Sequence, residues 1–421
     1  MNRRRFITTS TAALALAPCL PALAGAGTKN KLPLGEAFDR EVDAFMSARN
    51  IPGGALAVVK DRRLVYVRGY GWADREKKVT AGPESLFRIA SISKPITAVA
   101  VLKLIERGKL SFDAKVFQFL RPRRLLDGVI DRRLGEITVR QLLQHTGGWD
   151  RNKGFDPMFR SNRIAEATNS SRPATPRNII EYMMDQPLQF APGTRYAYSN
   201  FDYCLLGRII EKISGQSYEA FVRENVLAPM GIKRMRIGAT LHGKQAEGEV
   251  CYYMPDESLA NSVFPPPPEK VPWPYGGFHL EAMDAHGGWI ASAVDLARFA
   301  AAMDGPPRRA LLKAEMLREM YAPPPAPVSR TAEGKLEKSY YGCGWMVRPI
   351  SDGKASYWHT GSLPGTATLL VRRWDGLSWA VLFNQRSEDR KLPDEAIDAA
   401  LHRAADAVEK WPDYDLFRQF A

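Results

Sequence analysis

Cysteine is scarce in this sequence, and no metal-binding pattern is present. The 421 residues include four cysteines: Cys19 lies near the first residue, and Cys204, Cys251 and Cys343 are far apart. There is no C-x-x-C, no H-E-x-x-H and no cluster of histidine and aspartate, so we expect no metal and no cofactor. The odd number of cysteines after Cys19 predicts at least one free thiol, and their pairing stays open.

The uncharged, largely apolar stretch over residues 7–23 is too short and too rich in proline for a membrane-spanning helix. It follows three consecutive arginines and ends at an A-x-A sequence, which predicts a signal peptide over residues 1–24. The paired arginines before Phe6 are typical of the twin-arginine export route. We therefore expect a bacterial protein that is exported, periplasmic or secreted, with one domain over residues 25–421 and no transmembrane anchor after signal removal.

Basic residues outnumber acidic ones, but they are not concentrated. Lysine and arginine total 59 against 46 aspartates and glutamates, which gives a formal net charge of +13. No continuous basic helix and no alternation of basic and aromatic residues is visible, so nucleic acid is not an expected partner. A small-molecule or peptide substrate is the expected partner, and the sequence does not predict an oligomeric state.

Three short motifs follow one another along the chain: Ser91-Ile92-Ser93-Lys94, Tyr198-Ser199-Asn200 and His359-Thr360-Gly361. Each is short enough to arise by chance, since residues 351–354 also fit S-x-x-K and residues 145–147 also read H-T-G. The first copy contains Asp-Gly, which is typical of a hairpin turn, and the second ends a predicted helix. We therefore expect these two copies to be structural.

Ser91 stands where an apolar approach over residues 86–90 turns into a predicted helix over residues 91–108. A serine at a helix N-terminus has free backbone N–H groups beside it, which favour an oxyanion on an attacked carbonyl. Lys94 lies one turn further along the same face, so its amine reaches the Ser91 hydroxyl. If burial lowers the pKa of Lys94, this lysine takes the proton and Ser91 becomes a nucleophile.

Tyr198 and Asn200 follow a Pro-Gly-Thr loop and precede a predicted helix over residues 201–213. A phenol near a cationic lysine loses its proton more easily, so Tyr198 is a candidate general base and then an acid toward the leaving group. Asn200 is expected to hold Lys94 or to bind a substrate amide. The alternative is that the tyrosine only packs and the asparagine only caps the helix.

The third motif opens a predicted strand. His359 and Thr360 are expected to line a substrate that pairs with the strand edge, and Gly361 allows its backbone to approach closely. The backbone N–H of Ser362 would complete an oxyanion hole with that of Ser91.

The remaining pattern predicts strands near both ends of the chain and helices between them. Such an order predicts an α+β fold, with an antiparallel sheet built from both chain ends and a large helical insertion. The predicted strands are residues 54–59, 64–68, 358–361, 366–373 and 377–383, the last two joined by an Asp-Gly turn. The predicted helices are residues 91–108, 139–144, 201–213, 292–303 and 394–408. Residues 152–177 and the proline-rich residues 264–274 are predicted to be long loops or lids.

Taken together, the motifs resemble the three active-site elements of penicillin-recognising serine hydrolases. The nearest branch contains class C β-lactamases, D-alanyl-D-alanine carboxypeptidases and related esterases. The similarity extends over residues 35–408 and implies a β-lactamase-like fold. It is supported by the stretches 86–91, 138–143, 287–289 and 341–345.

One departure from that branch concerns His359. Class C β-lactamases usually carry lysine there, and its permanent charge attracts the carboxylate of penicillins. Histidine is mostly neutral at pH 7, so its attraction for a carboxylate is weaker. This departure from the pattern of class C β-lactamases therefore implies poor β-lactam turnover.

The sequence predicts a secreted serine hydrolase that cleaves an ester or amide substrate through a Ser91 acyl-enzyme. A D-alanyl-D-alanine carboxypeptidase and a weak class C β-lactamase share this machinery and remain alternatives. A non-catalytic binder of cell-wall peptides on the same fold is an alternative from another class. The sequence does not choose among the substrates, because pocket shape decides between them.

Overall fold

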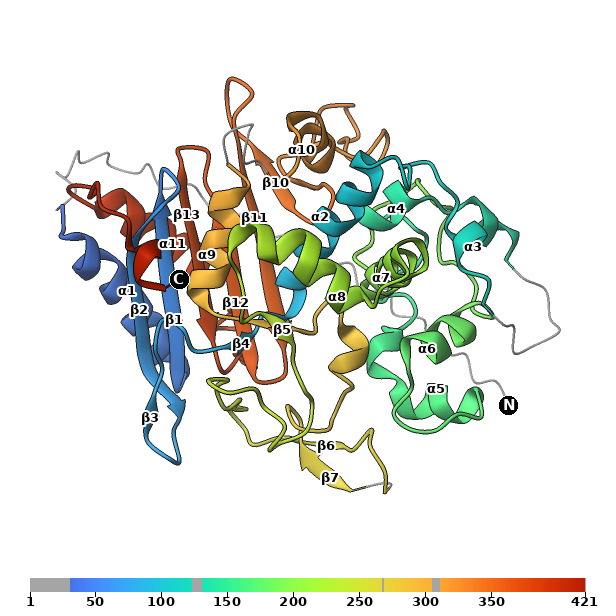
Figure 1. The fold of residues 1–421 in the computed structure, drawn as a ribbon, viewed down its shortest axis with the longest axis horizontal. Helices are drawn as coiled ribbons and strands as arrows, with labels where there is room; N and C mark the ends of the chain where they lie inside the picture. Colours follow the sequence, from blue (N-terminus) through green and yellow to red (C-terminus); the bar gives the residue numbers. More distant parts are fainter. Residues whose placement is uncertain (1–30, 123–130, 267–268, 305–310, 421) are drawn as a thin grey trace, which may run out of the picture.

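An antiparallel sheet of eight strands forms the centre of the protein (Figure 1). The computed structural model describes residues 31–122, 131–266, 269–304 and 311–420, so the predicted signal peptide lies outside the described residues. In spatial order the strands are β3 (Val79–Thr80), β2 (Arg63–Asp74), β1 (Gly53–Lys60), β13 (Leu377–Phe383), β12 (Thr366–Arg372), β11 (Ala355–Leu363), β10 (Met346–Pro349) and β9 (Tyr340–Tyr341).

The two ends of the chain meet in this sheet where β1 pairs with β13. Gly54 lies opposite Phe383 and Lys60 opposite Leu377, so the first hairpin is joined to the C-terminal strands. The turn between β12 and β13 contains Gly376 at a φ of 79°, as its Asp-Gly sequence predicts. The prediction of an antiparallel sheet built from both chain ends, in an α+β fold, is confirmed.

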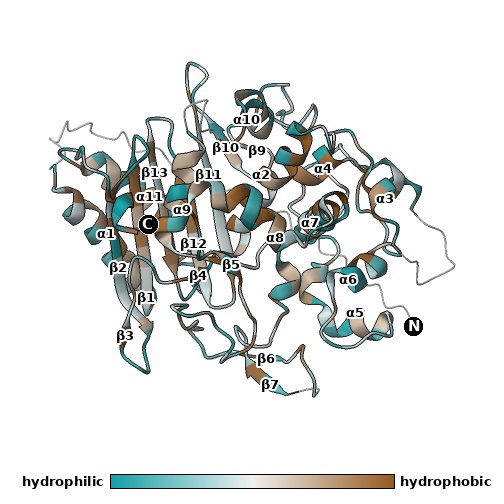
Figure 2. Ribbon diagram, in the orientation of Figure 1, coloured by the Kyte–Doolittle hydropathy of each residue, from teal (hydrophilic) through white to brown (hydrophobic). Residues whose placement is uncertain are grey.

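Helices cover both faces of the sheet. α1 (Leu34–Arg49) and α11 (Ala396–Ala407) pack together on one face, and α9 (Ala293–Ala302) packs on the other. Because both faces are covered, β12 and β13 are buried along their whole length, and most of their side chains are apolar. Figure 2 shows apolar segments along the central strands and along the helices beside them.

The helical insertion lies beside the sheet and separates its N-terminal and C-terminal strands in sequence (Figure 1). Its helices are α2 (Ser93–Glu106), α3 (Val116–Phe119), α4 (Val139–Leu143), α5 (Ser161–Ala167), α6 (Pro176–Met183), α7 (Asn200–Ser214) and α8 (Tyr218–Val222). A three-stranded sheet contains, in spatial order, β4 (Phe87–Arg88), β8 (Trp289–Ala291) and β5 (Arg236–Ile237). A two-stranded sheet pairs β6 (Leu259–Asn261) with β7 (Lys270–Pro272). The helix α10 (Ala314–Tyr321) follows α9 in the chain. All five predicted helices are present, and their ends agree with the prediction within two residues.

The prediction of a long loop over residues 152–177 is wrong in part. The segment contains a 3₁₀ turn (Pro157–Phe159) and the whole of α5, and α6 begins at its end. Asp156 caps the 3₁₀ turn by accepting a hydrogen bond from the backbone N–H of Met158. Elements this short carry less than two turns of apolar periodicity, which is why the pattern does not reveal them.

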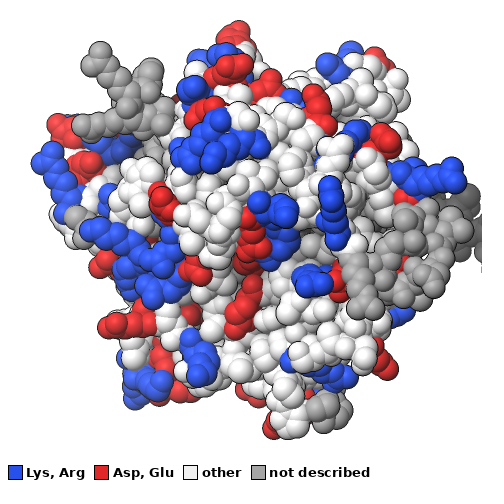
Figure 3. Space-filling view, turned by 45° about the vertical axis from the view of Figure 1, so that its right-hand side comes forward, with Lys and Arg blue, Asp and Glu red and all other residues white. Residues whose placement is uncertain are grey.

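The surface carries charges of both signs. Figure 3 shows lysine and arginine side chains spread over one face and interspersed with acidic ones, without a single continuous basic band. Within the ranges that the structure describes, no helix is long and apolar enough to cross a membrane.

Ser91 lies in a 3₁₀ turn (Ala90–Ile92) immediately before α2, rather than in the α-helix itself. The residue at the N-cap of α2 is Ile92, so the expectation that the helix starts at Ser91 is corrected by two residues. Ala90 has a φ of 46°, in the left-handed region that residues other than glycine rarely adopt. This strained residue turns the chain sharply just before Ser91.

The segment before Ser91 is fixed to the sheet by threonines of β12. The Thr366 hydroxyl donates to the carbonyl of Arg88 at 2.9 Å. Thr368 Oγ1 lies 3.1 Å from the carbonyl oxygen of Ile89 and 3.3 Å from that of Gly361. A Cβ on Gly361 would lie 2.2 Å from Thr368 Oγ1 and 2.3 Å from the Ile89 oxygen, so only glycine lets β11 pack this closely.

We therefore expect Gly361→Ala to push β11 away from the segment that carries Ser91. Overpacking of this kind costs roughly 1–3 kcal/mol of stability. The midpoint temperature of thermal unfolding and the rate of Ser91 modification by phenylmethylsulfonyl fluoride should both fall. Gly135→Ala is the matched control, since a Cβ there meets nothing within 4 Å. A Gly361→Ala protein with unchanged stability and labelling rate would contradict this account of the packing.

Candidate active site

The buried amine of Lys94 joins the first two motifs. Its Nζ lies 3.0 Å from Ser91 Oγ, 2.8 Å from Asn200 Oδ1 and 2.9 Å from the carbonyl oxygen of His286. These oxygens come from the turn before α2, from the first residue of α7 and from the chain just before β8. Three segments far apart in the sequence therefore converge on one amine.

The hydrogen bonds of Lys94 suit an uncharged amine. Burial is the largest cause that lowers its pKa well below the usual value, and the nearby positive charge of Arg151 acts in the same direction. A charged lysine has three N–H donors and no acceptor, and loss of one proton leaves two donors and a lone pair. The oxygens of Asn200 and His286 can only accept, so they take the two donors and leave the lone pair for the Ser91 hydroxyl. Lys94 is therefore placed to receive the Ser91 proton.

Asp156 fixes the orientation of Asn200. The Asn200 amide Nδ2 donates to Asp156 Oδ2 at 2.6 Å, so its Oδ1 is left to face Lys94. Burial raises the pKa of Asp156, while the hydrogen bond from Asn200 acts in the opposite direction. Asn200 thus connects a largely buried carboxyl group to the amine of Lys94, which agrees with the expectation that it holds this lysine.

Tyr198 lies beside the Lys94 amine, which is 4.7 Å from the centre of its ring. Burial raises the pKa of Tyr198, and a hydrogen bond with Ser91 opposes that shift. The expectation that a lysine charge lowers the pKa of Tyr198 is therefore wrong, because burial acts against the charged form of both groups. The phenol keeps its proton at neutral pH, which suits a donor to a leaving group better than a first base.

His359 is buried and neutral. Burial is the largest cause that lowers its pKa to about 3, and the Lys94 amine, when protonated, acts in the same direction. Its Nδ1 lies 2.7 Å from the Thr360 carbonyl oxygen, which can only accept, so Nδ1 carries the proton. Nε2 then accepts from the hydroxyl of Tyr341 at 2.9 Å. The third motif therefore brings no positive charge to the site.

A cleft of about 340 Å³ exposes these groups to substrate, and Ser91, Tyr198, His359, Thr360 and Ser362 line it. Gly361 lies between them on β11, with its backbone against the segment that precedes Ser91. The structure thus brings all eight predicted site residues to one place.

The two other copies of the motifs lie in structural positions. Ser351 is exposed in the turn between β10 and β11, where the Ile350 N–H donates to the Lys354 carbonyl at 2.8 Å. His145 is buried, and its ring centre is 4.4 Å from that of Tyr198. Its Nδ1 accepts from the backbone N–H of Ser199 at 3.2 Å, so it supports the second motif from behind.

Three further groups at the site are not among the predicted residues. Asp156 belongs to the segment predicted to be a loop, and Arg151 immediately precedes that segment. The Arg151 guanidinium lies 4.9 Å from the centre of the Tyr198 ring. Tyr341 belongs to the stretch 341–345, which supports the family resemblance but has no predicted role. No periodic pattern marks these residues, because each acts from a loop or a strand end.

The cysteines of the described residues form no disulfide. Cys204 and Cys343 are buried thiols, and Cys251 is partly exposed, so the prediction of a free thiol is confirmed. Among the residues that the structure describes, no group of three or more histidine, cysteine, aspartate or glutamate side chains is arranged to hold a metal ion.

Comparison with known proteins identifies relatives of the whole unit. The family model described as Beta-lactamase matches residues 38–403. Penicillin-binding protein 4* of Bacillus subtilis (strain 168) is 26% identical over 352 residues, which are 83% of this chain and 71% of that protein.

Solved structures show the same fold. A D-amino acid amidase from Ochrobactrum anthropi SV3, complexed with L-phenylalanine amide, aligns with a TM-score of 0.66 and 21% identity, covering 89% of this chain and 98% of the amidase. The octameric penicillin-binding protein homologue from Pyrococcus abyssi aligns with a TM-score of 0.64 and 24% identity, covering 88% of this chain and 78% of that one. At these identities the structures establish the fold alone.

The contacts of Lys94 lead to a prediction about pH. Modification of Ser91 by phenylmethylsulfonyl fluoride needs the neutral amine, so its rate should fall as pH drops through the pKa of Lys94. The Asp156 charge raises that pKa, because it stabilises the protonated amine. Asp156→Asn should therefore move the midpoint of this acid limb to lower pH.

Glu166→Gln is the control for this shift, since Glu166 is an exposed acid of α5 in the same segment. The midpoint is read from labelling rates measured by intact-protein mass across the pH range. A midpoint that stays in place in Asp156→Asn, or moves equally in Glu166→Gln, would show that Asp156 does not act on Lys94.

Proposed function

The chain belongs to the beta-lactamase family, and we propose that it cleaves an ester or amide substrate through a covalent acyl-enzyme on Ser91. As a member of this family it is a serine hydrolase. The observation that carries the proposal is the 3.0 Å contact between Ser91 Oγ and the buried amine of Lys94. A neutral amine in hydrogen-bond contact with a serine hydroxyl is a nucleophile paired with its base.

Acylation begins when Ser91 Oγ attacks the substrate carbonyl carbon and its proton passes to Lys94 Nζ. The carbonyl oxygen becomes an oxyanion, for which the backbone N–H groups of Ser91 and Ser362 are the donors. When this intermediate collapses, the bond to the leaving group breaks and the leaving group takes a proton from the Tyr198 hydroxyl. Lys94 then returns a proton to Tyr198, so the charges of the site balance.

Deacylation repeats the same steps with water. Water attacks the acyl carbon, and its proton passes to the Lys94–Tyr198 pair. The bond from the carbonyl to Ser91 Oγ breaks, and Oγ recovers a proton. Asn200 and His286 keep their hydrogen bonds to Lys94, and so they hold it in place in both half-reactions.

The neutral third motif favours an ester or amide over a β-lactam. A penicillin carries a carboxylate, and His359 offers no positive charge to attract it. The structural neighbour named as a D-amino acid amidase supports amide chemistry on this fold. A D-alanyl-D-alanine carboxypeptidase is the second candidate, since the relative from Bacillus subtilis is named as a penicillin-binding protein. A protein that only binds its ligand does not need a buried lysine amine in hydrogen-bond contact with a serine hydroxyl, so the contact between Lys94 and Ser91 favours an enzyme over a non-catalytic binder.

Export is part of the proposal. The predicted signal peptide over residues 1–24 supports a periplasmic or secreted location, where such a hydrolase would meet esters, amides and peptides from outside the cytoplasm. Fractionation of cells that produce the full chain, followed by N-terminal sequencing of the exported form, tests this location.

We expect Ser91→Ala to lose activity on a simple 4-nitrophenyl ester by roughly a thousandfold or more, as the loss of a nucleophile does. Ser351→Ala carries the same substitution in the other S-x-x-K sequence and should remain within about twofold of wild type in kcat/KM, since exposed serines contribute little. Rates are measured with the purified mature chain. Equal activity in Ser91→Ala and wild type would refute the assignment of the nucleophile.

Benzylpenicillin separates the candidates. We expect little consumption of the drug, because the site lacks a cation for its carboxylate. The drug is assayed in the supernatant, and the intact mass of wild type and Ser91→Ala is measured beside it. A persistent adduct on wild type alone would favour the carboxypeptidase, whereas rapid consumption without an adduct would contradict the expectation and support a class C β-lactamase.

A further inference from the structure

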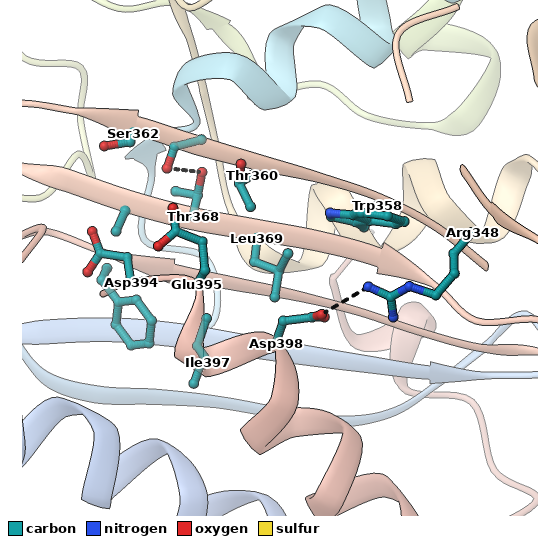
Figure 4. A pocket seen from close by; sticks show the side chains of 13 residues that line it. Arg348, Trp358, Thr360, Ser362, Thr368, Leu369, Asp394, Glu395, Ile397 and Asp398 are labelled. Carbon is teal, nitrogen blue, oxygen red and sulfur yellow. Dashed lines mark hydrogen bonds and ion pairs between the residues drawn. The ribbon is translucent and has the colours of Figure 1, made fainter. Parts of the chain in front are cut away.

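A second cavity, of about 270 Å³, opens next to the catalytic cleft (Figure 4). It lies on the face of the sheet that α11 covers, between β11 and the first residues of that helix. Thr360, Ser362 and Glu395 line both spaces, so the cavity continues the cleft past the edge of β11. A substrate that reacts at Ser91 and extends along β11 reaches this cavity.

Three carboxyl groups line the cavity, and two of them have partners. Asp394 accepts a hydrogen bond from the backbone N–H of Ser387 at 3.0 Å. Asp398 lies 4.0 Å from the guanidinium of Arg348, the ion pair drawn in Figure 4. Arg348 also lies 4.6 Å from the ring centre of Trp358, so the cation that lines this cavity is already engaged.

Glu395 is the carboxyl group without a partner among the described residues. It occupies the N-cap position of α11, yet its side chain makes no capping hydrogen bond. It is exposed, and it is the one of the three that also lines the cleft of Ser91. Figure 4 shows it on the helix side of the cavity, opposite Thr360 and Ser362 on β11.

The other groups at the cleft do not offset this negative charge. His359 is neutral, and burial favours the neutral form of Lys94. Among the described residues that line the cleft, the remaining cation is Arg151, which is 4.0 Å from Asp156 and lies against Tyr198. The wall formed by α11 is therefore negative where it meets the cleft.

We propose that Glu395 selects substrates by charge, favouring a positively charged group on the part of the substrate that lies along β11 toward α11 and rejecting a carboxylate there. The expected substrate class is an ester or amide that carries an amine or quaternary ammonium group. This inference rests on the proposed function, because it assumes that Ser91 is the nucleophile. It also separates the chain from hydrolases whose peptide substrates end in a free carboxylate.

The test uses three aryl sulfonyl fluorides of similar shape that differ in charge. They are 4-(2-aminoethyl)benzenesulfonyl fluoride, 4-ethylbenzenesulfonyl fluoride and 4-(fluorosulfonyl)benzoic acid. In each reaction Ser91 Oγ bonds to sulfur, fluoride leaves and Lys94 takes the proton. We expect the cationic reagent to label wild type about fivefold faster than the neutral one, and the anionic reagent about fivefold slower, on the scale of one partly solvated charge pair.

Glu395→Gln should bring the three rates together, and Glu395→Lys should invert their order. In both variants the rate for the neutral reagent should stay within about twofold of wild type, because an uncharged group has no Coulomb interaction with the charge at position 395. Glu409→Gln is the matched control: Glu409 is an exposed acid just beyond the far end of α11. It should leave the order of rates unchanged. Labelling is followed by intact-protein mass, with Ser91→Ala as the blank.

Two results would overturn the inference: equal rates for the three reagents in wild type, or an order of rates that Glu395→Gln leaves unchanged or Glu409→Gln removes equally. Either result leaves the proposed function intact, provided that wild type is labelled and Ser91→Ala is not. The absence of Ser91 labelling by every reagent would instead count against the proposed function, and with it against the inference.

Discussion

The contact between the Lys94 amine and the Ser91 hydroxyl is the constraint on which the site depends. An amine removed from water must find acceptors for its hydrogens, and here they are the side chain of Asn200 and the carbonyl of His286. Each acceptor belongs to a different segment of the helical insertion or of the chain that leaves it. The fold therefore has to bring these segments together before Lys94 can be buried, and burial in turn makes it a base.

The sheet supplies the second half of the site through backbone geometry. Ala90, in the left-handed region, turns the chain before Ser91, and the threonine hydroxyls of β12 hold that turn against the strands. Gly361 completes the arrangement, because any side chain there would strike the carbonyl of Ile89. The nucleophile is thus held between a rigid sheet and a buried amine. Small residues stand on both sides of this approach, since a Cβ on Gly361 would lie 3.2 Å from that of Ala90.

The sequence predicts well the sheet and the meeting of the three motifs in one site, since apolar runs, turn residues and short reactive patterns are local signals. It predicts less where function depends on burial or on residues without periodicity. The pKa of Tyr198 is raised because the phenol is desolvated, and no tripeptide contains that information. Asp156 lies in a segment that contains a 3₁₀ turn and a helix of seven residues, and Arg151 lies just before it. α1 is amphipathic but carries no motif, and it is not among the predicted helices.

The groups at the reacting bond are neutral, and the charged groups that would select the substrate lie apart from them. Lys94 and His359 are buried, and burial favours the neutral form of both, so the groups nearest the reacting carbonyl suit an uncharged ester or amide bond. The charged side chains that line the cleft, Arg151 and Glu395, lie further toward solvent and face different elements. A change at Glu395 should therefore alter which substrate binds without altering Lys94 as the base. A change at Asn200 should instead alter Lys94 without altering which substrate binds. In this arrangement specificity can diverge within the family while the machinery around Ser91 stays the same.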